Sequence, residues 1–218
     1  MKSMSRNTPP ARKYDSTRRQ AQARETRLKI VEAAHTLFLE RGYAGTTMEA
    51  IAEQAGVSPE TIYATLKNKR KILSFLFEIS VGGDDQPVRV LERPEPQAVL
   101  HDTDQHRQLT RFAKDITGIL SRAAPVFEIM RGAAKMEPEI AKLLQRLLRE
   151  RLRNMTVVAE HIAANGPLRE GLSKRMAAEI IWSMTSPELY RLFTLDLGWT
   201  NKQYTQWLLD TLIRLLLP

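Results

Sequence analysis

The sequence lacks several kinds of residue and segment, and each absence excludes a class of site. None of its 218 residues is cysteine, which excludes disulfides, thiolate zinc sites, iron–sulfur clusters and cysteine nucleophiles. Its four histidines do not show the spacing of a metal site. It has no apolar run of the roughly 18 residues that span a membrane and no apolar signal stretch near its start. We therefore expect a cytoplasmic protein without cofactor, metal or membrane partner.

The composition that remains is that of a folded globular protein, with 43% hydrophobic and 27% charged residues. The net charge of +8 is unevenly distributed: residues 1–80 contain 14 basic against 8 acidic residues, and residues 81–218 contain 19 against 17. Nine of the first 29 residues are basic and two are acidic. This density favours nucleic acid as a partner, although a basic arm that only aids solubility is the alternative. We predict a flexible basic arm over residues 1–22, including Arg18 and Arg19.

Three helices are predicted after this arm. Apolar residues at three- and four-residue spacing predict a helix over residues 17–41, which Gly42 ends. Thr46 with Glu49 predicts a capping box for a helix over residues 47–55. Ser58, followed by a proline and an acid, predicts the start of a helix over residues 59–66.

The second and third of these helices, joined through a glycine, form the pattern of a helix-turn-helix. In such a motif the second helix lies in the major groove of DNA. Helical hairpins with a glycine turn also occur in proteins that do not bind DNA. The basic residues that precede the motif favour DNA binding here.

The same region resembles the DNA-binding domain of the tetracycline-repressor (TetR) family. The resemblance is carried by Gly42-Tyr43-Ala44-Gly45-Thr46-Thr47-Met48, Ile51-Ala52, Ala55-Gly56-Val57-Ser58-Pro59-Glu60-Thr61-Ile62-Tyr63, Asn68-Lys69 and Ile72-Leu73. It implies an all-α protein, with a three-helix DNA-binding domain over residues 23–68 and a helical regulatory and dimerisation domain over residues 69–218. Thr65 and Leu66 depart from the family's usual histidine or tyrosine followed by phenylalanine, which puts one backbone contact at position 65 in doubt.

The resemblance also implies which residues touch DNA. Residues that contact phosphates contribute affinity for every DNA sequence, whereas residues that contact bases set the preferred sequence. Glu60 could accept from a cytosine amino group, or it could only complement the helix dipole. The predicted DNA contacts are Thr47, Ser58, Pro59, Glu60, Thr61, Tyr63, Thr65, Lys67, Lys69, Arg18 and Arg19.

The remaining chain is predicted to be helical, apart from a proline-containing loop or lid that follows Gly82-Gly83-Asp84-Asp85 and runs to about Gln97. Helices are expected over residues 104–120 and 138–162, after Ser173 and from Thr200, with a new helix opened by Pro125 and another by Pro187. The arginine-rich face of the helix over residues 138–162 could be a second nucleic-acid site or an ordinary solvated face.

The last helix carries apolar residues on more than one face. This pattern predicts cover by both its own domain and a second chain, the alternative being burial within one chain. The predicted dimer residues are Ile181, Tyr204, Trp207, Leu208, Leu212 and Leu215. The candidate residues for an apolar effector pocket are Phe112, Phe127, Met130, Met155, Trp182 and Met184, for which core packing is the alternative role.

These observations predict a bacterial transcription regulator that binds double-stranded DNA. We expect a homodimeric repressor of a palindromic operator, released by an unknown small-molecule effector. The alternatives are an enzyme in a helical domain and an architectural DNA-binding protein. The sequence shows no nucleophile–base arrangement and no glycine-rich phosphate loop, which disfavours an enzyme.

Overall fold

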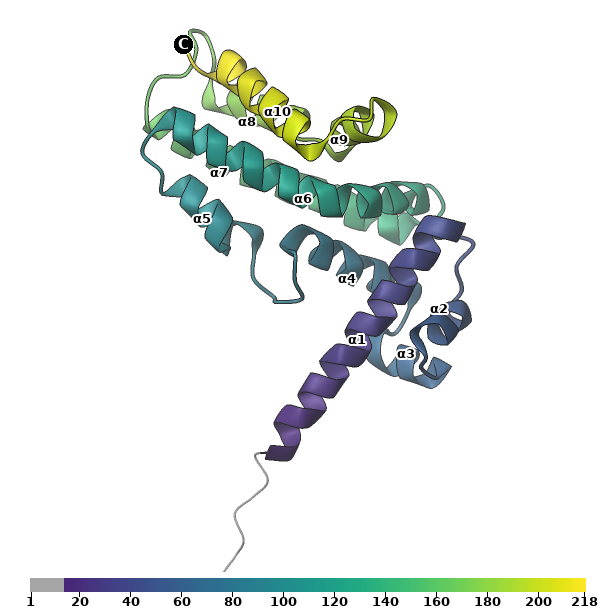
Figure 1. The fold of residues 1–218 in the computed structure, drawn as a ribbon. Helices are drawn as coiled ribbons and strands as arrows, with labels where there is room; N and C mark the ends of the chain where they lie inside the picture. Colours follow the sequence, from purple (N-terminus) through teal and green to yellow (C-terminus); the bar gives the residue numbers. More distant parts are fainter. Residues whose placement is uncertain (1–13) are drawn as a thin grey trace, which may run out of the picture.

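The computed structural model describes residues 14–218, and every regular element in that range is a helix (Figure 1). This confirms the predicted all-α fold. The helices are α1 (Tyr14–Arg41), α2 (Met48–Ala55), α3 (Pro59–Leu66), α4 (Lys69–Gly82), η1 (Val90–Glu92), α5 (Pro94–Leu100), α6 (Gln105–Ala134), α7 (Pro138–Ala164), α8 (Lys174–Met184), α9 (Pro187–Arg191), η2 (Leu192–Asp196) and α10 (Asn201–Leu216). Within residues 14–218, no helix is long and apolar enough to cross a membrane.

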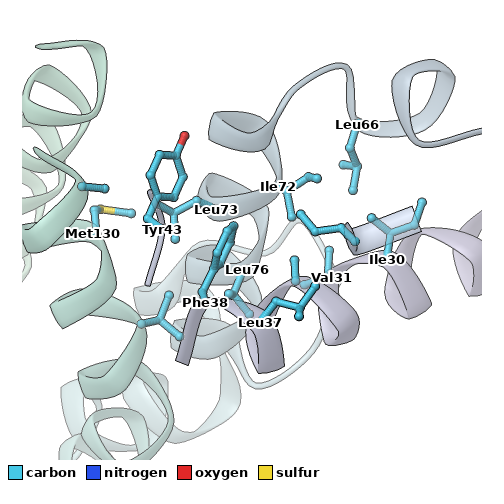
Figure 2. Close-up of a cluster of buried hydrophobic side chains, with 14 of the residues drawn as sticks. Ile30, Val31, Leu37, Phe38, Tyr43, Leu66, Ile72, Leu73, Leu76 and Met130 are labelled. Atoms are coloured by element: carbon cyan, nitrogen blue, oxygen red, sulfur yellow. The ribbon is translucent and has the colours of Figure 1, made fainter. Parts of the chain in front are cut away.

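One apolar core joins the first four helices to the start of the larger domain. Ile30, Phe38, Ile62 and Leu73 are almost completely buried in it, and Met130 of α6 packs into the same cluster. Figure 2 shows Met130 reaching toward this core beside Tyr43. The helix-turn-helix therefore rests on α6 as well as on its own helices.

A second core fills the C-terminal domain. It is built from α5, α6, α7, α8 and α10, whose apolar faces are buried against one another. Tyr204 is completely buried there, and its ring meets that of Tyr190 edge-on at 5.0 Å. In Figure 1, α8 and α10 form the layer farthest from the helix-turn-helix.

Local capping signals fix most helix starts. The hydroxyls of Ser58, Ser173 and Ser186 each accept from a backbone N–H three residues on, and Thr200 forms a capping box with Gln203. The predicted box at Thr46 was wrong by one residue. Thr47 is the cap, and the buried Thr46 hydroxyl donates to the carbonyls of Leu37 and Gly42.

Three other predictions were wrong in whole or in part. Residues 14–22, assigned to a flexible arm, belong to α1, which begins three residues before the helix predicted over residues 17–41; the rest of that arm lies outside the described residues. Pro125 does not open a helix but lies inside α6, where buried neighbours such as Phe127 hold the helix together across the missing N–H. The segment before Gln97 is not a plain loop, because η1 and α5 form within it; Pro94 occupies the first turn, where a proline is tolerated.

Candidate nucleic-acid interface

The second helix of the helix-turn-helix, α3, presents its N-terminal residues to solvent. Gly56 takes the left-handed backbone that turns the chain between α2 and α3. Ser58, Pro59 and Glu60 are exposed, and Thr61 is half-buried. Hydrogen bonding to its own backbone N–H, and then to the Ser58 hydroxyl, lowers the pKa of Glu60. Glu60 is therefore ionised at neutral pH and lies where it stabilises the start of the helix.

The predicted contact residues with hydroxyl groups differ in what their hydroxyls can still do. The Thr47 oxygen accepts from the backbone N–H of Ala50 at 3.1 Å, which leaves its proton to donate outward. Tyr63 is 48% exposed, with only a 3.5 Å hydrogen bond to Glu49. Thr65 instead donates to the Thr61 carbonyl at 2.7 Å, so its proton is already used within α3.

Lys69 lies in a different position from the one that the sequence indicates. Its ammonium group donates to the backbone carbonyls of Tyr43 and Thr46, both at 2.8 Å, and lies 4.3 Å from the centre of the Tyr43 ring. Burial lowers the pKa of Lys69. Two of its three protons therefore hold the turn that leads to Thr47, and only one remains for a phosphate.

Lys67 joins α3 to α4 in a strained backbone conformation. It is the one non-glycine residue with positive φ in the described part of the chain, at φ 62° and ψ −46°. The Asn68 N–H donates to the Leu66 carbonyl at 2.6 Å, which closes a γ-turn around it. Such a conformation costs a residue with a side chain about 1–3 kcal/mol.

Replacing Lys67 separates its backbone strain from its charge. We expect Lys67→Gly to raise the free energy of unfolding by about 1 kcal/mol, because glycine adopts positive φ without a clash but loses more chain entropy. Lys67→Ala keeps the strained backbone, so its free energy of unfolding should not rise. If the Lys67 cation contacts phosphate, both variants should bind DNA equally weakly. Urea unfolding and DNA titration measure the two effects, and equal stability of the two variants would refute the strain.

Arg18 and Arg19 are exposed on the N-terminal half of α1, which extends beyond the other helices of its domain (Figure 1). Further along α1, Arg24 pairs with Asp85 after α4 through Nε at 2.6 Å and Nη2 at 2.5 Å. This two-point ion pair ties α1 to the loop that leads into the larger domain.

The predicted dimer residues are mostly internal. Ile181, Tyr204, Leu208 and Leu212 are completely buried within one chain, so this part of the prediction was wrong. They form the buried stripes by which α8 and α10 pack on their own domain. Trp207 and Leu215 are half-buried. Large apolar side chains that remain exposed nearby include Met176, Leu192, Leu195 and Leu197.

The six predicted pocket residues do not share one cavity. Phe112 and Met155 line a small cavity of about 30 Å³ under η1 and α5, together with Asp115 and Asn154. Phe127 and Met184 line an open groove of about 830 Å³ between α6 and α9.

The other two predicted pocket residues line neither space. Met130 is buried in the core shared with the helix-turn-helix, and the Trp182 ring lies 5.1 Å from the Arg151 guanidinium. The pocket prediction also missed Asp115, an acid between Phe112 and Ile116 on an otherwise apolar face of α6. An acid at that position of an apolar stripe was the available signal.

A capped, exposed recognition helix on a basic N-terminal domain defines a helix-turn-helix DNA-binding protein. Residues 30–74 match the family model of bacterial regulatory proteins of the tetR family. The chain is 30% identical to the HTH-type transcriptional regulator YdeS of Bacillus subtilis (strain 168) over 77% of this chain and 78% of that protein. It therefore belongs to the TetR family, whose members are DNA-binding transcription regulators and not enzymes.

Solved structures agree on the fold. FadR from Bacillus subtilis, in complex with stearoyl-CoA, has a TM-score of 0.68 at 23% identity and covers 85% of this chain and 97% of that chain. The SmeT–triclosan complex has a TM-score of 0.64 at 20% identity and covers 89% of this chain and 92% of that chain.

Proposed function

We propose that this protein is a homodimeric repressor that binds a palindromic operator and is released by a small-molecule effector. The observation that carries the proposal is the recognition helix. A protein that binds DNA through charge alone does not require Ser58, Glu60 and Thr61 to be presented from a capped helix N-terminus. In this proposal, residues 58–61 contact base edges. The phosphates are contacted by Thr47, Tyr63, Arg18 and Arg19.

Exposed apolar residues of α8 and of the segment between α9 and α10 support a dimer. Met176 on α8 and the leucines at positions 192, 195 and 197 leave large apolar side chains in water, with exposed fractions of 49%, 49%, 64% and 61%. Large exposed apolar side chains are typical of surfaces that another chain covers. A two-fold dimer places two recognition helices on half-sites about 34–36 Å apart.

An effector is supported by the position of the small cavity within the larger domain. A ligand that prefers one arrangement of this domain changes the affinity of the recognition helices for DNA by linkage. FadR and SmeT, which share this fold, were solved with stearoyl-CoA and triclosan respectively. The two ligands differ in chemistry, so the effector has to be inferred from this chain's own cavity.

Selection of bound duplexes from a random DNA library, at about 150 mM salt where non-specific binding is weak, tests the proposal. We expect enrichment of a palindrome with half-sites about one helical turn apart. Recovery of DNA without an enriched sequence would favour an architectural role and would overturn the repressor proposal.

Two substitutions in α3 test the division between phosphate and base contacts. Tyr63→Phe should weaken binding to the selected operator and to random DNA equally, by about 3- to 10-fold, because it removes one hydroxyl donor. Thr61→Ala should change the preference between operator variants. Thr65→Ala is the matched control, because its hydroxyl is already bonded within the helix. Equal losses on both kinds of DNA for Thr61→Ala would contradict this assignment.

A further inference from the structure

The small cavity of the larger domain is lined by two half-buried polar side chains among apolar ones. Its walls are apolar side chains of η1, α5, α6 and α7, such as Leu91, Phe112 and Met155. The Asp115 carboxylate and the Asn154 amide also line it, and neither makes a hydrogen bond or ion pair with any residue in the described range of 14–218. Both polar groups are therefore free to bind water or a ligand at the apolar surface of this cavity.

The charged neighbours of Asp115 act on its pKa in opposite directions. Burial, and then the nearby Glu95 carboxylate on α5, raise the pKa of Asp115 to about 6. Arg122, about two turns further along α6, is the cation that lowers the pKa of Asp115. The Arg122 Nε, however, donates to the Ser80 carbonyl at 3.2 Å, so this guanidinium is held at the end of α4.

We propose that this cavity binds an apolar ligand with a cationic amine, whose ammonium group pairs with Asp115 and is oriented by Asn154. This inference rests on the proposed function, since it names the chemical class of the effector. An ammonium group supplies both the positive charge and the hydrogen-bond donors that a carboxylate in an apolar surrounding lacks. The apolar walls take the rest of the ligand. A ligand with an anionic end faces repulsion from Asp115 and Glu95.

The cavity has about the volume of one water molecule, so the proposed ligand requires η1 and α5 to move outward. These two short elements cover the cavity through Val90, Leu91 and Pro96. The loop before them is held by Arg93, which donates to both carboxylate oxygens of Asp84 at 3.0 and 2.9 Å. Outward movement of this cover therefore pulls directly on the loop after α4.

The same loop holds the DNA-binding domain. Asp85, next to Asp84, is the residue that pairs with Arg24 of α1. A ligand that displaces η1 thus shifts a loop that anchors α1, the longest helix of the DNA-binding domain. This connection gives an amine a different affinity for the DNA-competent and DNA-incompetent arrangements, as release by linkage requires.

Three probes of equal length test the inference on the full chain: n-octylamine, octanol and octanoate. Isothermal titration calorimetry at pH 8 should show octylamine binding at least about tenfold more tightly than octanol, and octanoate more weakly than octanol. The preference for octylamine should fall as the pH is lowered below about 6, where Asp115 becomes protonated. Equal affinity for octylamine and octanol at pH 8 would overturn the proposal.

Matched variants locate the site. Asp115→Asn keeps the shape of the side chain and should lose the preference for octylamine over octanol. Asp196→Asn removes an acid that lines the open groove instead, and should keep that preference. If Asp196→Asn lost the preference for octylamine and Asp115→Asn kept it, the amine would bind in the groove, and the assignment of the ligand to the cavity would be refuted.

The coupling and the proposed function fail in distinguishable ways. Asp85→Asn should bind octylamine as the unmodified chain does, while octylamine should change its operator affinity less. An equal change in both chains would overturn the route through Asp85. Selection of an operator without amine binding would refute this inference and leave the repressor intact. Amine binding without a selected operator would refute the repressor and leave the cavity assignment intact.

Discussion

Lys69→Ala is expected to lower the free energy of unfolding by about 2–4 kcal/mol and to weaken binding to all DNA sequences. The substitution removes a charged donor from the carbonyls of Tyr43 and Thr46, each at 2.8 Å, together with a cation above the Tyr43 ring. Hydrogen bonds to charged groups contribute about 1.5–3 kcal/mol each, and a cation–π contact adds about 0.5–1 kcal/mol. Part of this sum is recovered because water reaches the site.

The loss of DNA binding follows from the position of the turn. The Lys69 ammonium holds the backbone just before Thr47, the residue that caps α2 and faces outward. When the turn loosens, α2 no longer supports α3 at a fixed angle. Because phosphate contacts position the protein on any duplex, affinity should fall on operator and random DNA together.

Lys71→Ala provides the matched control, since Lys71 is an exposed lysine on the same helix. Urea unfolding followed by circular dichroism, and fluorescence anisotropy with labelled duplexes, measure the two effects. If Lys69→Ala is as stable as Lys71→Ala, the Lys69 ammonium group does not stabilise the turn through the two carbonyls. A loss confined to DNA affinity would instead indicate a direct phosphate contact.

Asp115→Asn is expected to raise the free energy of unfolding at pH 8 by about 1–2 kcal/mol. Burial and Glu95 raise the pKa of Asp115 from 3.8 to about 6, so folding disfavours its ionised form. A shift of two pKa units corresponds to about 3 kcal/mol, and remaining contact with water reduces this figure. The chain without ligand therefore carries a carboxylate that lowers its own stability.

The pH dependence of this gain gives a direct check. A raised pKa in the folded state means that the cost of the carboxylate is fully present above about pH 6 and absent below about pH 4. The difference in stability between Asp115→Asn and the unmodified chain should shrink to nothing over that range. Asp196→Asn, which removes an exposed acid, should show no such gain. A gain that is constant with pH would show that Asp115 is not the titrating group.

The cost at Asp115 agrees with a binding role. Sites that bind charged ligands often lower the stability of the free protein, because their polar groups are paired only when the ligand is bound. An amine that pairs with Asp115 should restore more stability to the unmodified chain than to Asp115→Asn. Thermal unfolding with and without octylamine measures this difference.

The sequence by itself determined the features that depend on neighbouring residues. Ser58 before a proline, Thr200 three residues before Gln203 and Gly56 between two short helices each act within one turn of backbone. Such local signals were enough to predict the helix-turn-helix, and the resemblance of residues 42–73 to the TetR family predicted the family. The predicted bounds of α3 agree with the structure because both of its ends are fixed locally.

Only the tertiary structure decided what depends on distant contacts. Burial against other helices carries α6 through Pro125, and it turns Tyr204 and Leu208 inward although their helix is apolar on several sides. The fold brings Lys69 to carbonyls 23 and 26 residues away and places the half-buried Asp115 at the wall of an apolar cavity. The physical reason is that periodicity shows which side chains are apolar, whereas their neighbours in space decide which polar groups find partners.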